Sequence, residues 1–182
     1  MATDNVHPTV RALLAETTAV QGPSRKVRSQ PFYQAVLGRN TSETKRFLES
    51  GADVNWHGGS GSRAFALHVA AWAGDLPLAE LLLSYGADVR KHGGDRWTAL
   101  HSTAMGVLGA SYVEEDKAAI AALLIDRGAD VNALSDDVKR LDGGGTDSGV
   151  TPLGLARAWN HHQIEALLLR HGAADKYDVV AL

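Results

Sequence analysis

The chain has 182 residues, a formal net charge of −3 and no cysteine. This length favours one domain that is long enough to bury a core. The charge provides no sequence-wide attraction to nucleic acid or to an anionic membrane, and the lack of cysteine excludes a disulfide scaffold, a thiolate metal site and a cysteine nucleophile.

Residues 1–29 are predicted to precede the main domain. Residues 1–7 lack the basic and apolar pattern of a signal peptide, and no run in the chain reaches the 18 apolar residues of a membrane span. We therefore expect a cytoplasmic protein. The spacing of Val10, Leu13 and Leu14 predicts one short helix within residues 8–18, and a basic linker follows at residues 21–28.

A five-residue word, Gly-Ala-Asp-Val-Asn, recurs along the rest of the chain. With small changes it stands at residues 51–55, 86–90, 128–132 and 172–175. Leu67, Leu100 and Leu153 anchor similar helix starts before the last three words. The distances from anchor to word are 19, 28 and 19 residues, so the unit that begins near Leu100 carries a nine-residue insert.

Each of these units is predicted to form two short antiparallel helices. Thr98 and Thr151 are typical N-cap residues, and Pro152 suits the first helical position, where its missing N–H costs nothing. Gly86 and Gly128 are predicted to end helices in the left-handed conformation. In the second helix of each unit, apolar residues with i, i+3, i+4 spacing predict a buried stripe, formed by Leu78, Leu81 and Leu82, by Ile120, Leu123 and Leu124, and by Ile164, Leu167 and Leu168.

The helix starts at the anchor leucines, together with the five-residue word that follows each of them, resemble the ankyrin repeat family. Units of that family open with Thr-Pro-Leu-His and close with Gly-Ala-Asp-Val-Asn. The resemblance implies an all-α ankyrin-repeat solenoid of stacked helix-turn-helix units with β-hairpin-like fingers. Tyr33 stands where the family has histidine, which is an irregularity typical of an end unit. The resemblance covers residues 30–175 and leaves a tail at 176–182, and its four units are 30–55, 56–90, 91–132 and 133–175.

Two inserts depart from the family pattern. One lies between the two helices of the third unit, around residues 107–117, and contains Tyr112. The other lengthens the last finger, residues 133–150, by about eleven residues. We expect the two inserts together to wall part of the concave face into a pocket.

Large aromatic residues stand where the resemblance places the concave face. Trp72, Trp97 and Trp159 come from three consecutive units, and such rings are common binding hot spots. An alternative is that the inserts or the N-terminal segment cover these rings. The candidate partner-binding residues are the three tryptophans together with Asp95, Met105, Tyr112 and Val150.

His68 and His101 occupy the family's Leu-His position, where the resemblance implies that the imidazole bonds to the backbone of a neighbouring finger. The chain has no nucleophile elbow, no phosphate loop and no zinc-protease motif.

The preferred hypothesis is a non-catalytic, monomeric module that binds another protein through its concave face and fingers, with no cofactor and no metal. Nucleic acid and membrane are not expected partners. The alternative is a small-molecule binder or a cofactor-free acid/base enzyme that uses His101 and Asp95 in a concave pocket enclosed by the two inserts.

Overall fold

The computed structural model describes residues 25–58, 64–105, 114–136, 138–139, 146–147 and 149–174. The predicted helix at residues 8–18 and the tail at 176–182 lie outside these ranges. Residues 25–28, which were predicted to be part of a linker, are helical and begin the first described helix, so the linker prediction was wrong there. In the described part of the chain, no helix is long and apolar enough to cross a membrane. The predicted cytoplasmic location stays a prediction.

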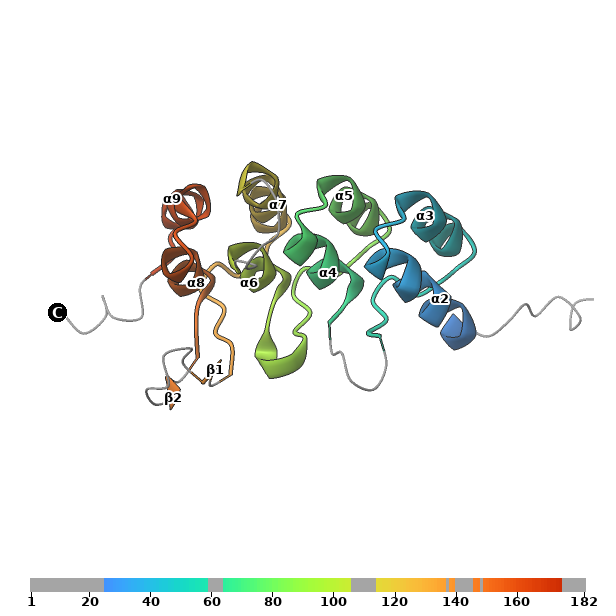
Figure 1. Ribbon diagram of the computed structural model, residues 1–182, viewed down its shortest axis with the longest axis horizontal. Coiled ribbons are helices and arrows are strands. Elements are labelled where there is room, and N and C mark those ends of the chain that lie inside the picture. The colour runs from blue at the N-terminus through green and yellow to red at the C-terminus, as the bar shows by residue number, and fades with distance from the viewer. Residues whose placement is uncertain are drawn as a thin grey trace, which may run out of the picture.

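Eight α-helices in the described ranges form four stacked pairs, as Figure 1 shows. Inner helices α2, α4, α6 and α8 make one row, and outer helices α3, α5, α7 and α9 make the other. This arrangement is the predicted all-α solenoid. The pairs are α2 (Arg25–Leu37) with α3 (Thr41–Glu49), α4 (Ala66–Ala73) with α5 (Leu76–Ser84), α6 (Ala99–Ala104) with α7 (Glu114–Asp126), and α8 (Pro152–Ala158) with α9 (His162–Arg170).

Two inner helices begin at threonines whose hydroxyls satisfy free backbone N–H groups. Thr98 Oγ1 accepts from the N–H of His101 at 3.3 Å, and Thr151 Oγ1 accepts from the N–H of Gly154 at 3.1 Å. Both predicted N-caps are confirmed. Phe65 holds the same place before α4 and makes no side-chain cap.

Two outer helices, α5 and α7, are followed by the predicted glycines in the left-handed conformation. Gly86 has a φ of 83° and Gly128 a φ of 86°. This left-handed conformation costs little for glycine because it has no Cβ. The chain therefore leaves each helix in the direction of the next finger, as the repeated word predicts.

The core lies between the two rows of helices. Two residues of each predicted stripe are fully buried, while the middle residues Leu81, Leu123 and Leu167 are only partly buried against the core. The predicted stripe is therefore confirmed at its first and third positions, and its middle leucines pack against the edge of the core. A residue four places along a helix lies about 40° from the first, but one three places along lies about 60° away on the other side. The fully buried residues are Leu78, Leu82, Ile120, Leu124, Ile164 and Leu168.

Fingers project from the inner row on one side of the stack (Figure 1). In the last finger, β1 (Val138–Lys139) pairs antiparallel with β2 (Thr146–Asp147). Val138 lies opposite Asp147, and Lys139 lies opposite Thr146. The second finger contains a short 3₁₀ helix, η1 (Gly94–Arg96).

The asparagine that closes the repeated word ties neighbouring units together. Asn55 Nδ2 donates to the carbonyl of Gly86 at 3.1 Å, and its Oδ1 accepts from the N–H of Asp88 at 2.9 Å. Asn132 makes the same two bonds to the unit that follows it, at 3.2 and 2.8 Å.

The second word ends in Arg90 in place of asparagine. Within the described ranges, the Arg90 side chain neither donates to the carbonyl of Gly128 nor accepts from the N–H of Asp130, which are the two bonds that an asparagine would make there. The second and third units are therefore joined without the tie that joins their neighbours.

Candidate functional site

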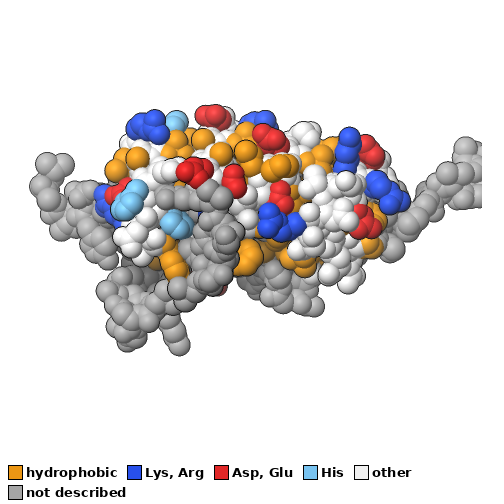
Figure 2. Space-filling model, turned by 45° about the horizontal axis from the view of Figure 1, so that its top comes forward, with side chains coloured by type: hydrophobic (Ala, Val, Ile, Leu, Met, Phe, Trp, Pro, Cys, Tyr) orange, Lys and Arg blue, Asp and Glu red, His pale blue; other side chains and the backbone are white. Residues whose placement is uncertain are grey.

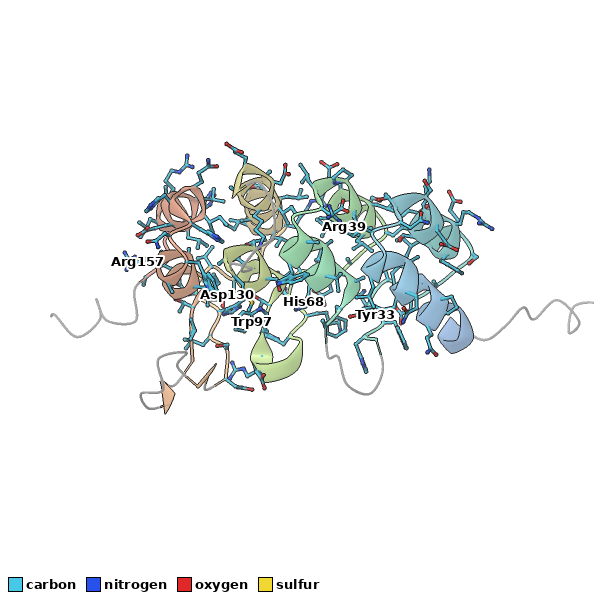
Figure 3. The ribbon with its side chains drawn as sticks, viewed as in Figure 1. Tyr33, Arg39, His68, Trp97, Asp130 and Arg157 are labelled. Atoms are coloured by element: carbon cyan, nitrogen blue, oxygen red, sulfur yellow. The ribbon has the colours of Figure 1, made fainter. Side chains whose placement is uncertain are left out.

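A groove of about 720 Å³ runs along the inner helices where the first two fingers leave them. It is lined by residues from the end of α2, from α4, from the second finger and from α6 with the residue that follows it. Figure 3 shows Tyr33, His68 and Trp97, which line the groove, following one another along this level of the stack. The groove therefore spans three consecutive units.

Four predicted binding residues meet in this groove: Trp72, Trp97, Asp95 and Met105. Val150 and Trp159 are half-buried and do not line it. Tyr112 lies outside the described residues. The binding role of all seven residues stays a prediction.

The two tryptophans of the groove are held differently. Trp72 lies on α4 directly after the buried Ala70 and Ala71, and 45% of its surface is exposed. Trp97 is half-buried, with its ring 5.1 Å from the ring of His101 and tilted by 37°. Trp97 thus offers a fixed surface, whereas Trp72 leaves a large apolar surface in water.

His101 is fully buried and bonded at both ring nitrogens. Its Nδ1 accepts from the N–H of Thr98 at 3.2 Å, so Nε2 carries the proton and donates to the carbonyl of Val150 at 2.9 Å. Burial lowers the pKa of His101 to about 4, against the weaker raising effect of the Val150 carbonyl. His101 links α6 to the backbone of the next finger, as the resemblance implies.

His68 makes the equivalent bond one unit earlier, from Nε2 to the carbonyl of Trp97 at 2.9 Å. Its Nδ1 is buried and has no hydrogen-bond partner among the described residues. Phe65 explains this difference, because it lacks the hydroxyl that Thr98 provides in the next unit. Burial lowers the pKa of His68 as well.

The proposed acid/base pair does not converge in this structure. Asp95 lines the groove, whereas His101 is 0% exposed and does not line it. Because both nitrogens of His101 are engaged with the backbone, the ring has no free position for proton transfer to a ligand. Among the described residues, no group of three or more His, Cys, Asp or Glu could hold a metal ion.

Two charged residues line the groove, Arg39 and Asp95. Arg39 Nε donates to Asp75 Oδ2 at 3.1 Å, so a carboxylate whose side chain is 11% exposed already neutralises this cation. Within the described part of the chain, the carboxylate of Asp95 has no ion pair or hydrogen bond. Among the described residues that line the groove, Asp95 is therefore the one charge without a partner, and it is negative.

Several groove residues were missed by the sequence prediction. Leu37 is the clearest, because it stands five residues after Phe32, as Trp72 stands five residues after Leu67. Treating Phe32 as the anchor of the first unit would have found it. Val69 and Ser102 each stand two residues after an anchor, at a position the prediction did not consider.

Figure 2 shows the face that the outer helices form. Charged side chains of both signs are interspersed there with hydrophobic ones, and neither sign gathers into one patch. Tyr85 follows α5 and is 38% exposed, outside the groove. It is a suitable control for an exposed aromatic ring elsewhere on the molecule.

Comparison with known proteins agrees with the repeated fold. A sequence model described as ankyrin repeats (3 copies) matches residues 67–180. The chain is 38% identical over 79 residues to the human Notch-regulated ankyrin repeat-containing protein, which covers 41% of this chain and 68% of that protein. The Xenopus tropicalis protein of this name gives the same values, and Danio rerio protein B is 36% identical over 83 residues, which covers 43% of this chain and 73% of that protein.

Proposed function

Because the chain belongs to the ankyrin repeat family, we propose that it is a non-catalytic module that binds another protein through the groove on its inner face. Ankyrin repeats generally mediate contacts between proteins. The observation that carries the proposal is Trp72, an exposed indole beside Trp97 and Met105 in an apolar groove. The name of the relatives describes them as regulated by Notch and states no binding partner, so the proposal rests on the groove.

The exposed part of Trp72 is large enough to dominate an interface. A tryptophan side chain buries roughly 200 Å² when fully covered, so the 45% that remains exposed corresponds to about 100 Å². At about 25 cal/mol per Å², covering this surface contributes about 2.5 kcal/mol. We therefore expect the loss of the indole to weaken binding roughly sixtyfold.

The test captures partners from a lysate of the native host and compares recovery by quantitative mass spectrometry. The wild-type chain, Trp72→Ala and the matched control Tyr85→Ala are used at equal concentration, after circular dichroism has shown equal helicity. A true partner is recovered by the wild type and by Tyr85→Ala, but is strongly depleted with Trp72→Ala. Equal recovery of every protein by all three variants contradicts the proposal.

A small molecule in the same groove is the second candidate. The volume of about 720 Å³ lies within the range of roughly 300–1,000 Å³ that small-molecule sites occupy. A metabolite library screened by thermal shift distinguishes the two candidates. A compound that raises the melting temperature of the wild type but not of Trp72→Ala favours the small molecule.

A further inference from the structure

We propose that the groove selects a protein segment that presents a cationic side chain, arginine more strongly than lysine, between apolar side chains. This inference rests on the proposed function and names the chemistry of the partner. It comes from three features of the groove: its charge balance, the held backbone at Asp95 and the aromatic rings that line the same groove.

The charge balance of the groove favours a cation. Arg39 is already paired with Asp75, so its charge is largely satisfied before any partner arrives. Asp95 has no ion pair or hydrogen bond at its carboxylate among the described residues, although it lines the groove. A partner that brings a carboxylate would meet this charge unpaired, whereas a partner that brings a guanidinium would neutralise it.

The backbone that carries Asp95 is held in a defined conformation by the second finger. Asp95 and Arg96 have φ angles of 55° and 54°, in the left-handed region that non-glycine residues adopt at a cost. The N–H of Asp136, from the next finger, donates to the carbonyl of Asp95 at 2.7 Å. Within the second finger, the N–H of Gly93 donates to the carbonyl of Trp97, also at 2.7 Å. These bonds offset the strain and hold the backbone from which the Asp95 side chain extends.

The residues around Asp95 leave its carboxylate open to a cation of the partner and offer that cation aromatic surfaces. The side chain of Arg96, next in sequence, lies 3.8 Å from Asp136 Oδ1 and pairs with that residue instead. Trp97 and Trp72 line the same groove as Asp95. A planar guanidinium stacks on an indole face and also pairs with a carboxylate, which an ammonium group does less well. The apolar neighbours of the cation would contact Val69 and Met105.

The experiment uses a phage-displayed library of random linear peptides, selected against the full folded chain. Selected peptides are synthesised, and their dissociation constants are measured for the wild type, Asp95→Asn, Glu80→Gln and Trp72→Ala. Asparagine tolerates the left-handed conformation and removes the charge. Glu80→Gln makes the same change in net charge at an exposed position on α5, outside the groove, and leaves the pair between Arg96 and Asp136 in place.

The proposal expects peptides enriched in arginine flanked by apolar residues. Asp95→Asn should weaken them about tenfold, and Glu80→Gln should change their affinity less than twofold. Replacing the peptide arginine with lysine should weaken binding to the wild type, and replacing it with citrulline should weaken it about as much as Asp95→Asn does.

Two other outcomes are distinguishable. Peptides that depend on Trp72 but show no cationic enrichment and no effect of Asp95→Asn overturn this inference and leave the proposed function standing. A selection that yields no peptide dependent on Trp72 counts against the proposed function, and against this inference with it.

Discussion

Lowering the pH from 7 to 5 is expected to destabilise the fold through His101. The pKa of this buried imidazole is about 4, against 6.5 in the unfolded chain. Above pH 6.5 the His101 ring is neutral in both the folded and the unfolded chain, so its titration takes nothing from the free energy of unfolding. As the pH falls below 6.5, the unfolded chain binds a proton that the folded chain does not bind until near pH 4, and the stability is progressively lost.

The size of this effect follows from the two pKa values. Each tenfold change in proton affinity corresponds to about 1.4 kcal/mol, so the complete loss below pH 4 is about 3 kcal/mol. At pH 5 most of it is already lost, about 2 kcal/mol relative to pH 7. His68 acts in the same direction, because burial lowers its pKa as well.

Urea unfolding at pH 7, 6 and 5 measures this loss. The wild type should lose about 2 kcal/mol more than His101→Gln between pH 7 and 5, while His171→Gln, at an exposed position, should follow the wild type. Equal losses for the wild type and His101→Gln would refute the reasoning. If His101→Gln does not fold, an NMR titration of the His101 ring in the wild type decides, and a pKa near 6.5 would be the contrary result.

Three further predictions concern the stack. Leu82→Ala should cost about 2–5 kcal/mol and Leu81→Ala only about 1–2 kcal/mol, because Leu82 is fully buried and Leu81 is not; equal costs in urea unfolding would contradict the assigned core face. Arg90→Asn should supply the missing tie to the third unit and raise the unfolding free energy by about 1 kcal/mol, and an unchanged or lower melting temperature would show that the tie does not form there. Gly86→Ala should lower the unfolding free energy by about 1 kcal/mol, and this loss should come from the φ of 83° alone, because an added Cβ meets nothing within 4 Å. An unaltered unfolding free energy would be inconsistent with that φ.

The repeated sequence motifs were enough to predict most of the fold, because each motif acts on the backbone within a few residues of itself. Thr98 and Thr151 cap helices, Gly86 and Gly128 end them, and the result follows from backbone bonding within a few residues. The burial of Leu81 was predicted less well. Helical spacing predicts which face of a helix is apolar. The positions of the neighbouring helices decide how much of that face is buried.

The groove was only partly predictable. Trp72 and Trp97 could be placed because the unit repeats, and Leu37 was missed because the first unit has Phe32 in place of the anchor leucine. The left-handed backbone at Asp95 is only weakly signalled by the sequence, because Asp tolerates this conformation but does not require it. The N–H of Asp136, from another finger, bonds to the Asp95 carbonyl, and this contact has no local sequence pattern.

The asparagine ties are unevenly distributed along the stack. Asparagine bonds couple the first unit to the second and the third to the fourth, while the central junction is held by the packing of α4 against α6 and by the bond between His68 and the Trp97 carbonyl. Trp72 and Trp97 lie on opposite sides of this junction. A partner that covers both rings would therefore add contacts between the two middle units, at the junction that lacks an asparagine tie.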